Sequence, residues 1–298
     1  MAQGVTPADV AHRHGVVLDD HPLLPGSMSG STVVTGVRDG QAVVVKITVH
    51  DSDEATGRAR REFAALTGLA LPIPMPRVLA GEVTAEHTVV VMRAHRPALT
   101  EEHPVPSLPL WTSLVDLLAR LHATPMPLDS PADSLWRYQG WSELDPVNDR
   151  PALDLLWSTP QTRSQLQRVL DHRDGLEVLA SAAEEEFVHG DCHWGNVVTD
   201  NGDPLLVDWQ SAGIGRGTDD LAFLLTRAAA DLDVVPRTTV IADYAARRGL
   251  DPAEVEARVT ARQLLVLALQ YPAFVSYLHP RAVERLHTLF VQLRHRPR

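Results

Sequence analysis

Residues 187–196 read FVHGDCHWGN, and the dipeptide Asp208-Trp209 follows twelve residues after the end of this segment. The segment places a carboxylate at Asp191, a carboxamide at Asn196 and, past a short expected hairpin, a second carboxylate at Asp208. Carboxylate and amide oxygens are ligands that Mg²⁺ accepts, and a positioned carboxylate can also orient an attacking hydroxyl. The spacing therefore predicts a loop that holds magnesium and a hydroxyl beside a nucleotide phosphate, as phosphotransfer requires.

A second signal is the only lysine of the chain. Lysines and arginines together number 27, and a single lysine, Lys46, is found among them. It lies in the apolar segment AVVVKI, residues 42–47, which predicts a strand. A compact ammonium can reach phosphate oxygens as a point charge, which a planar guanidinium does less well. The alternative is a lysine on an exposed strand face, and the other motifs favour the phosphate contact.

Length and composition bound the class of protein. With 298 residues and 44% apolar content, the chain is long enough for one large or two modest domains with a well-buried core. It shows no secretory signal at the amino terminus, and its longest apolar runs fall short of the roughly 20 residues that a membrane helix needs. The single cysteine, Cys192, fits a reducing compartment, so we expect a cytoplasmic protein without membrane partners.

The formal net charge is −11. Proteins that bind nucleic acid offer basic surfaces to the phosphate backbone, so this balance argues against a nucleic-acid partner. It is compatible with a cationic small-molecule substrate. We expect a monomer or a weak dimer.

The pattern changes from strands to helices along the chain. A small-residue loop at 25–31 leads into β-branched residues, Asp39-Gly40 predicts a hairpin turn, and prolines after residue 71 end a helix. Strands are expected at 32–37, 41–49, 77–82 and 88–92, and helices at 7–13, 53–69, 110–122, 161–170, 176–186, 218–229, 237–248, 255–270 and 280–293. We place a domain boundary near residue 92, giving an amino-terminal lobe over 1–92 and a helical lobe over 93–298.

A β-rich lobe with a glycine loop and a strand lysine, joined to a helical lobe with an Asp…Asn…Asp loop, is the protein-kinase-like plan, a bilobal α+β fold. In detail the chain resembles the aminoglycoside phosphotransferase and choline kinase superfamily. The resemblance spans roughly residues 20 to 230. It rests on the motifs His189-Gly190-Asp191, Asn196, Asp208, residues 213–217 leading into Asp220-Leu221-Ala222, and residues 118–122.

The resemblance implies roles for the catalytic residues. Asp191 matches the catalytic aspartate that orients the substrate hydroxyl for in-line attack. Asn196 and Asp208 match the two ligands of Mg²⁺. Lys46 would bridge the α- and β-phosphates of ATP or GTP, and Glu62 on the following helix would hold it.

It also implies supporting roles. The loop residues Ser29, Gly30 and Ser31 would cover the phosphates, although no Walker-type loop is present. The adenine would stack at the hinge, pairing with backbone groups near Val91 and Arg93. His189 and Asp220 would support the catalytic loop rather than transfer protons.

The acceptor pocket of such folds is built from the inserted region and the carboxy-terminal helices. Here that region offers Glu143, Asp145, Asp149 and Asp154 beside Trp136, Trp141 and Trp157. Carboxylates bind ammonium groups and indoles cover cations, so we expect a cationic antibiotic as acceptor, an aminoglycoside or a basic peptide, and a role in resistance. A solvated acidic surface is the alternative reading, as is a metabolite kinase acting on choline, homoserine or methylthioribose.

Two other classes of protein share part of this pattern. His189, Asp191, Cys192 and His193 crowd together, as in a metal-dependent hydrolase. That reading leaves Lys46 and the glycine loop unexplained. A non-catalytic nucleotide-binding module is the other alternative, and no expected catalytic group is missing to support it.

Overall fold

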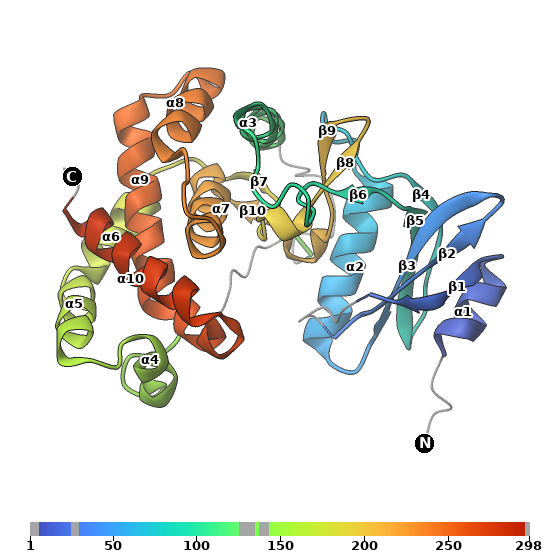
Figure 1. The fold of residues 1–298 in the computed structure, drawn as a ribbon, viewed down its shortest axis with the longest axis horizontal. Helices are drawn as coiled ribbons and strands as arrows, with labels where there is room; N and C mark the ends of the chain where they lie inside the picture. The colour runs from blue at the N-terminus through green and yellow to red at the C-terminus, as the bar shows by residue number, and fades with distance from the viewer. Residues whose placement is uncertain (1–5, 25–29, 125–134, 137–142, 296–298) are drawn as a thin grey trace.

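The computed structural model describes residues 6–24, 30–124, 135–136 and 143–295 and shows two lobes (Figure 1). The amino-terminal lobe is a five-stranded antiparallel sheet in the order β1-β2-β3-β5-β4. Helix α2 packs on the sheet through β3, β4 and β5. The elements of this lobe are α1 Pro7–Arg13, β1 Val17–Leu23, β2 Thr32–Arg38, β3 Gln41–Val49, α2 Asp53–Gly68, β4 Val78–Val83 and β5 His87–Arg93.

The β2–β3 hairpin sets the position of the lysine. Asp39 and Gly40 both have positive φ, 50° and 77°, as the two central residues of a type I′ turn require. The resulting register places Lys46 opposite Val33 on one side and Val90 on the other. Lys46 therefore lies in the middle of the sheet and is only 6% exposed, which contradicts the reading of a lysine on an exposed strand face.

Helix α2 begins where the sequence predicts. The Ser52 hydroxyl accepts a hydrogen bond from the amide of Ala55 at 3.1 Å and so caps the first turn. Two charged residues of this helix, Arg61 and Glu62, are buried together with Ala65. Buried charges need partners, and both residues find them in the carboxy-terminal lobe or the sheet, as described below.

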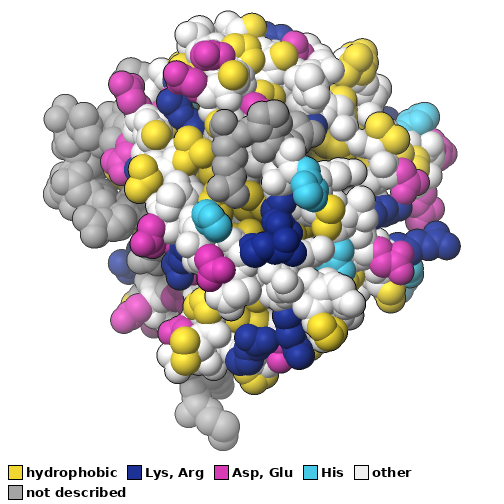
Figure 2. Space-filling view, turned by 90° about the vertical axis from the view of Figure 1, so that its left-hand side faces the viewer, with side chains coloured by type: hydrophobic (Ala, Val, Ile, Leu, Met, Phe, Trp, Pro, Cys, Tyr) yellow, Lys and Arg dark blue, Asp and Glu magenta, His cyan; other side chains and the backbone are white. Residues whose placement is uncertain are grey.

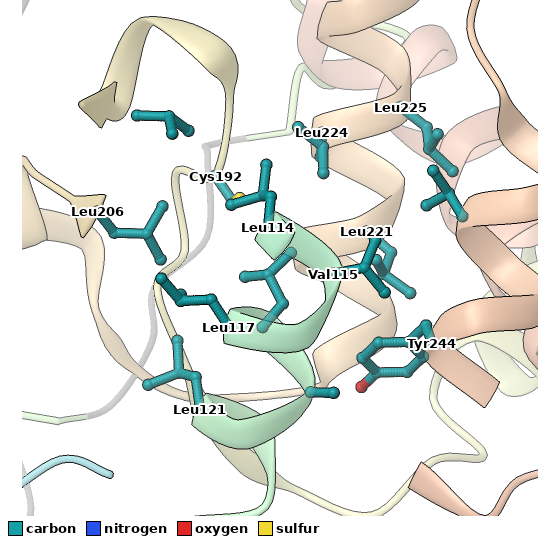
Figure 3. Close-up of a cluster of buried hydrophobic side chains, with 14 of the residues drawn as sticks. Leu114, Val115, Leu117, Leu121, Cys192, Leu206, Leu221, Leu224, Leu225 and Tyr244 are labelled. Carbon is teal, nitrogen blue, oxygen red and sulfur yellow. The ribbon is translucent and has the colours of Figure 1, made fainter. Parts of the chain in front are cut away.

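The carboxy-terminal lobe is built around α3. Figure 3 shows Leu114 of this helix beside Cys192 of the catalytic segment, and Val115 on the side that faces Leu221 of a neighbouring helix. The helices are α3 Leu108–His122, α4 Arg150–Leu156, α5 Pro160–Leu170, α6 Arg173–Ala180, α7 Gly217–Asp231, α8 Arg237–Arg248, α9 Pro252–Leu265 with its π-helical continuation η3 Val266–Gln270, η4 Tyr271–Tyr277 and α10 Pro280–Arg294.

Short strands position the loops of the site. They are β6 Arg96–Pro97, β7 Glu186–Val188, β8 Val197–Asp200, β9 Asp203–Leu206 and β10 Gly213–Gly215, with the one-turn helices η1 Trp194–Asn196 and η2 Trp209–Ser211 between them. The hairpin register pairs Val197 with Leu206, and the amide of Val207 donates to the carbonyl of Asn196 at 2.9 Å. The hairpin thereby brings Asn196 beside Asp208, although twelve residues separate them in sequence.

The fold class is confirmed, and some elements differ from the sequence prediction. The helix expected at 176–186 ends at Ala180, because Glu186 is drawn into β7 by antiparallel pairing with Gly215 of β10. The expected linker at 93–97 contains β6, which pairs with β8. These errors share a cause, since partners distant in sequence supply the hydrogen bonds.

The surface mixes charges of both signs. Figure 2 shows the side of the molecule at the left of Figure 1, where basic and acidic side chains lie among hydrophobic and neutral ones. Within the described ranges, no helix is both long and apolar enough to span a bilayer.

Candidate active site

A buried ion-pair network joins the two lobes. The Nζ of Lys46 lies 2.7 Å from Oε2 of Glu62 and 2.8 Å from Oδ1 of Asp208. Lys46 and Glu62 are nearly inaccessible, whereas the Asp208 side chain keeps 22% of its surface exposed. The network thus leads from α2 through the central strand to a carboxylate that faces solvent.

The two carboxylates keep the lysine charged. Burial by itself lowers the pKa of Lys46, but the charges of Glu62 and Asp208 oppose it and the net shift is upward. Burial raises the pKa of Glu62, against the pull of Lys46. A charged ammonium is therefore held at the end of the network that faces the lobe interface, where phosphate oxygens would be attracted.

Asp208 has an unusual backbone. Its φ and ψ are both 64°, in the left-handed region that residues other than glycine seldom adopt. Such a conformation costs of order 1–3 kcal/mol and persists only when the surroundings enforce it. Here the strand β9 before it and the turn η2 after it fix the chain direction, and the Asp208 carboxylate points to Lys46.

Asp191 and Asn196 are held together by the catalytic loop. The Asn196 Nδ2 donates to the Asp191 carbonyl at 3.0 Å and to Asp191 Oδ2 at 3.1 Å. Because both bonds use the amide nitrogen, Asn196 Oδ1 is left as an acceptor that can ligate a cation. The oxygens of Asn196 and Asp208 form the neutral and anionic donor set that suits Mg²⁺, so these residues fit the ion that the resemblance implies.

The environment of Asp191 disfavours its ionised form. The pKa of Asp191 is well above its ordinary value, first because the carboxyl is buried and second because the Asp208 carboxylate is near. The hydrogen bond from Asn196 and the charge of Arg227 act in the opposite direction. The carboxylate is therefore more basic than an exposed one, which suits a group that accepts a hydrogen bond or proton from an alcohol.

Asp220 fixes the backbone of the catalytic loop. Its Oδ2 and Oδ1 accept hydrogen bonds from the amides of His189 and Gly190, both at 2.8 Å. His122 Nε2 lies 3.1 Å from Asp220 Oδ2 and its Nδ1 lies 2.9 Å from the Tyr244 hydroxyl. Four elements, α3, α7, α8 and the loop after β7, meet at this buried carboxylate.

The imidazole of His189 is likewise occupied by backbone. Its Nε2 lies 3.0 Å from the carbonyl of Val207, next to Asp208, and its Nδ1 accepts from the amide of Asp191 at 3.3 Å. Burial lowers the pKa of His189, so the neutral ring is favoured. His189 therefore ties the segment before Asp208 to the catalytic loop.

Sequence reasoning missed a second inter-lobe contact made by α2. The guanidinium of Arg61 donates to the carbonyl of Leu135 at 2.7 Å and to the carbonyl of Gln210 at 2.8 Å. Gln210 lies two residues after Asp208, so Arg61 and Glu62 hold the same loop from adjacent positions of one helix. The stripe of Arg61, Glu62 and Ala65 at helical spacing was the available signal.

The predicted phosphate loop is only partly described. Ser29 lies outside the described residues. Gly30 has φ 74°, a left-handed conformation that glycine adopts without strain, and its position is open. Ser31 is buried, and its Oγ lies 2.8 Å from Oγ1 of Thr48, so its hydroxyl already has a partner within the sheet.

The hinge residues expected to meet adenine belong to the sheet. Val91 is buried and pairs with Val45 on one side and Ala80 on the other. The amide of Arg93 donates to the carbonyl of Arg77 at 3.0 Å. The role of Val91 and Arg93 in holding a purine stays a prediction.

The acidic residues expected to bind the acceptor do not converge with Asp191 in any described contact. Each carboxylate has partners of its own, mostly in its own segment: Glu143 pairs with Arg173 at 2.8 Å, Asp145 accepts from the amide of Val147 at 2.7 Å, Asp149 accepts from the amide of Asp145 at 2.7 Å, and Asp154 pairs with Arg150 at 3.0 Å. Their role as acceptor ligands stays a prediction.

The described tryptophans of the same region also have partners of their own. Trp136 is buried with its ring centroid 5.5 Å from that of Phe187, and Trp157 is buried 4.6 Å from Phe290. Both are core residues here, because each indole is buried and packs against another ring. Trp141 lies outside the described residues.

The side chains that suggested a hydrolase do not gather around one point. His189 is bound to backbone, as described above, and Cys192 lies in the apolar cluster of Figure 3. Burial raises the pKa of the Cys192 thiol far above its ordinary value, so the thiolate that a metal would need is disfavoured. Among the described residues, no group of three or more His, Cys, Asp or Glu is placed to hold a metal ion.

A two-lobed α+β fold with a strand lysine held by a helix glutamate, facing an Asp, Asn and Asp set, defines the class of kinase-like phosphotransferases. The sequence matches the phosphotransferase enzyme family over residues 22–257, and the chain belongs to this family. No curated protein sequence matches the chain.

Solved structures show the same fold at low identity. A microcompartment-associated aminopropanol kinase has 18% identity and a TM-score of 0.68, covering 98% of this chain and 97% of its own. The amicoumacin kinase hAmiN, in complex with AMP-PNP, Ca²⁺ and its antibiotic, has 14% identity and a TM-score of 0.59 over 97% and 93% of the two chains. The macrolide 2′-phosphotransferase MphH from Brachybacterium faecium has 16% identity and a TM-score of 0.55 over 97% of each.

Proposed function

We propose that this enzyme transfers the γ-phosphoryl group of ATP or GTP to an alcohol group of a small molecule. The observation that carries the proposal is the joining of the Lys46, Glu62 and Asp208 network to the Asp191 and Asn196 pair by a single hairpin. One end of this arrangement offers a buried ammonium for phosphates. The other offers a basic carboxylate for the acceptor.

Each group then has a task in the reaction. The transferred phosphoryl passes through a loose transition state, so the protein contributes positioning and charge stabilisation more than covalent chemistry. Lys46 would hold the α- and β-phosphates when they draw it away from Asp208. Asn196 and Asp208 would hold Mg²⁺, which when bound neutralises phosphate charge.

Asp191 would orient the acceptor. Its carboxylate accepts the hydrogen bond of the attacking hydroxyl and takes the proton as the new P–O bond forms, an event that its raised pKa favours. The bond between the γ-phosphorus and the β–γ bridging oxygen breaks in the same transfer, and the nucleoside diphosphate leaves. Asp220 and His189 act through the backbone, because they fix the loop that carries Asp191. The backbone near Val91 and Arg93 is proposed to receive the purine.

Two kinds of similar structure support two different classes of acceptor. The neighbouring kinases that bear antibiotic names support an antibiotic acceptor and a role in resistance. The aminopropanol kinase, with a TM-score of 0.68, supports a small amino alcohol instead. A cytoplasmic location remains our proposal from the sequence.

The test is ADP formation from Mg-ATP with a panel of aminoglycosides, basic peptide antibiotics, macrolides and small amino alcohols. We expect Asp191→Asn to lower kcat with the accepted compound by about 10²–10⁴-fold, while Mg-nucleotide affinity measured by calorimetry changes only a few-fold. Asp203→Asn, which changes an exposed carboxylate at the start of β9, is the matched control. Wild-type turnover in Asp191→Asn would refute the assignment.

A further inference from the structure

Helix α7 leads away from the catalytic loop along one face. The ring of Phe223 lies 6.1 Å from that of His193, centroid to centroid. Arg227 follows four residues later and Asp231 four after that, so both lie on the same side of the helix as Phe223. At 1.5 Å per residue, Arg227 is about 6 Å further along the axis. This face therefore connects the catalytic loop with whatever lies beside Arg227 and Asp231.

A cavity of about 520 Å³ lies beside that face, between α7, η4 and the start of α10. Its size suits a small organic molecule. The lining includes Arg227, Asp231, Phe274, Tyr277, Arg281 and Arg285. The cavity combines two aromatic side chains with charged ones, as ligand sites commonly do.

Positive charge dominates this cavity in a chain of net charge −11. Three arginines face it, with one aspartate among its lining residues. Arg285 is engaged by the carbonyl of Ala230 and by the carboxylate of Asp233. The other two guanidinium groups, of Arg227 and Arg281, are less completely paired.

Arg227 has donor capacity to spare. The guanidinium lies beside the Tyr271 hydroxyl and the Asp231 carboxylate, with its Nη2 3.7 Å from Asp231 Oδ2, beyond hydrogen-bonding distance. Within the described part of the chain its buried Nε has no hydrogen-bond acceptor. Arg281 is exposed, and no ion pair or side-chain hydrogen bond links it to another described residue. A guanidinium with free donors matches a planar or tetrahedral oxyanion.

The charge of Arg227, which lines the cavity, also acts on residues of the catalytic loop. The charge of Arg227 lowers the pKa of both Asp191 and His193. For Asp191 it opposes the larger upward effect of burial, and for His193 it adds to the larger downward effect of burial. Tyr271, whose hydroxyl is buried, lies close enough to Arg227 and Asp191 to respond to both charges. Arg227 also lies one turn of α7 beyond Phe223, whose ring lies 6.1 Å from that of His193, so an oxyanion on Arg227 would lie on the side of α7 that faces the catalytic loop.

We propose that this cavity binds an acidic group, a carboxylate or a phosphate, carried by the same acceptor whose hydroxyl meets Asp191. The inference rests on the proposed phosphotransfer function and narrows its substrate class. Arg227 and Arg281 are the specificity residues for the acidic group, while Phe274 and Tyr277 cover the apolar part of the acceptor. An amine on the same molecule remains compatible, because Asp231 lies in the same cavity.

Matched acceptor pairs test this proposal. L-Serine with ethanolamine, and L-homoserine with 3-amino-1-propanol, each differ by one carboxylate. We expect the carboxylate-bearing member to have the higher kcat/KM by about tenfold or more, as one charge-assisted contact would give. Arg281→Gln and Arg227→Gln should remove that preference, and Arg168→Gln, on the remote helix α5, should keep it. Equal turnover within each pair, or a preference that survives both variants, overturns the proposal.

A binding measurement separates this subsite from the reaction. Calorimetric titration of malonate requires no turnover, and we expect the affinity of Arg281→Gln to be about tenfold weaker than that of the wild type and of Arg168→Gln. Malonate binding that depends on Arg281, without ADP formation from any acceptor, would support the subsite and contradict phosphotransfer. Turnover with malonate affinity unchanged in Arg281→Gln would contradict the subsite alone.

Discussion

Replacing Glu62 with glutamine isolates the charge that holds Lys46. Glu62 is 2% exposed and its Oε2 lies 2.7 Å from the Lys46 Nζ. Glutamine keeps the shape and one acceptor oxygen, so the change exchanges a hydrogen bond between charged groups for one to a neutral acceptor. Lys46 is the charged donor in both cases, so both bonds are charge-assisted, but the bond to glutamine lacks the attraction of the second charge and is weaker by about 1–2 kcal/mol. The difference of roughly 1–2 kcal/mol corresponds to a factor of about 5–30.

The direction of the effect on the nucleotide follows from the third member of the network. Without the Glu62 charge, Lys46 is drawn more strongly to Asp208, its remaining partner 2.8 Å away. Phosphate must then compete with a tighter ion pair, and Asp208 is less available to the metal. We therefore expect Glu62→Gln to weaken Mg-ATP binding about 5–30-fold.

The assay combines calorimetric Mg-ATP affinity, the KM for ATP and thermal unfolding without nucleotide. Glu54→Gln is the matched control, because Glu54 lies in the first turn of the same helix, pairs with Arg58 and is 66% exposed. The control should behave as wild type. Wild-type affinity and KM in a folded Glu62→Gln enzyme would show that this pair does not position Lys46 for phosphate.

Two further changes test the supports of the site. Arg61→Met removes two hydrogen bonds from a buried guanidinium to carbonyl groups, so urea unfolding should show a loss of about 2–4 kcal/mol together with a raised KM for Mg-ATP, while Arg60→Met, at an exposed position, should change neither. Asp220→Asn should lower the free energy of unfolding at pH 7 by about 2–4 kcal/mol. The pKa of Asp220 is lowered, because the partners around this buried carboxyl, His122 first, outweigh the opposing effect of burial. The stability that its ionised form contributes is therefore present above the ordinary pKa of 3.8 and lost as pH falls below it, so the gap to the variant should close in acid, and a gap that persists there contradicts this account.

Local sequence patterns predicted much of the fold. The Asp39-Gly40 turn, the cap at Ser52 and the apolar periodicity of α3 each depend on neighbours in sequence, and the structure has all three. The helix expected to run to residue 186 ends at Ala180, because β7 gains its hydrogen bonds from β10, whose paired residues lie 25 to 29 positions further on. Hydrophobic periodicity and secondary-structure propensity are properties of one segment, and pairing with a distant strand can override both.

The sequence by itself determined which chemical groups the catalytic loop carries: Asp191, Asn196 and Asp208 lie within one short stretch whose hairpin is locally encoded. Only the tertiary structure decided which distant charges meet. Lys46 reaches Asp208 across 162 positions, and Arg61 reaches the backbone of Gln210 across 149. A charged side chain takes whichever partner the packing of helices and sheets leaves beside it, because burying it unpaired costs several kcal/mol, and that choice is not written in its neighbours along the chain.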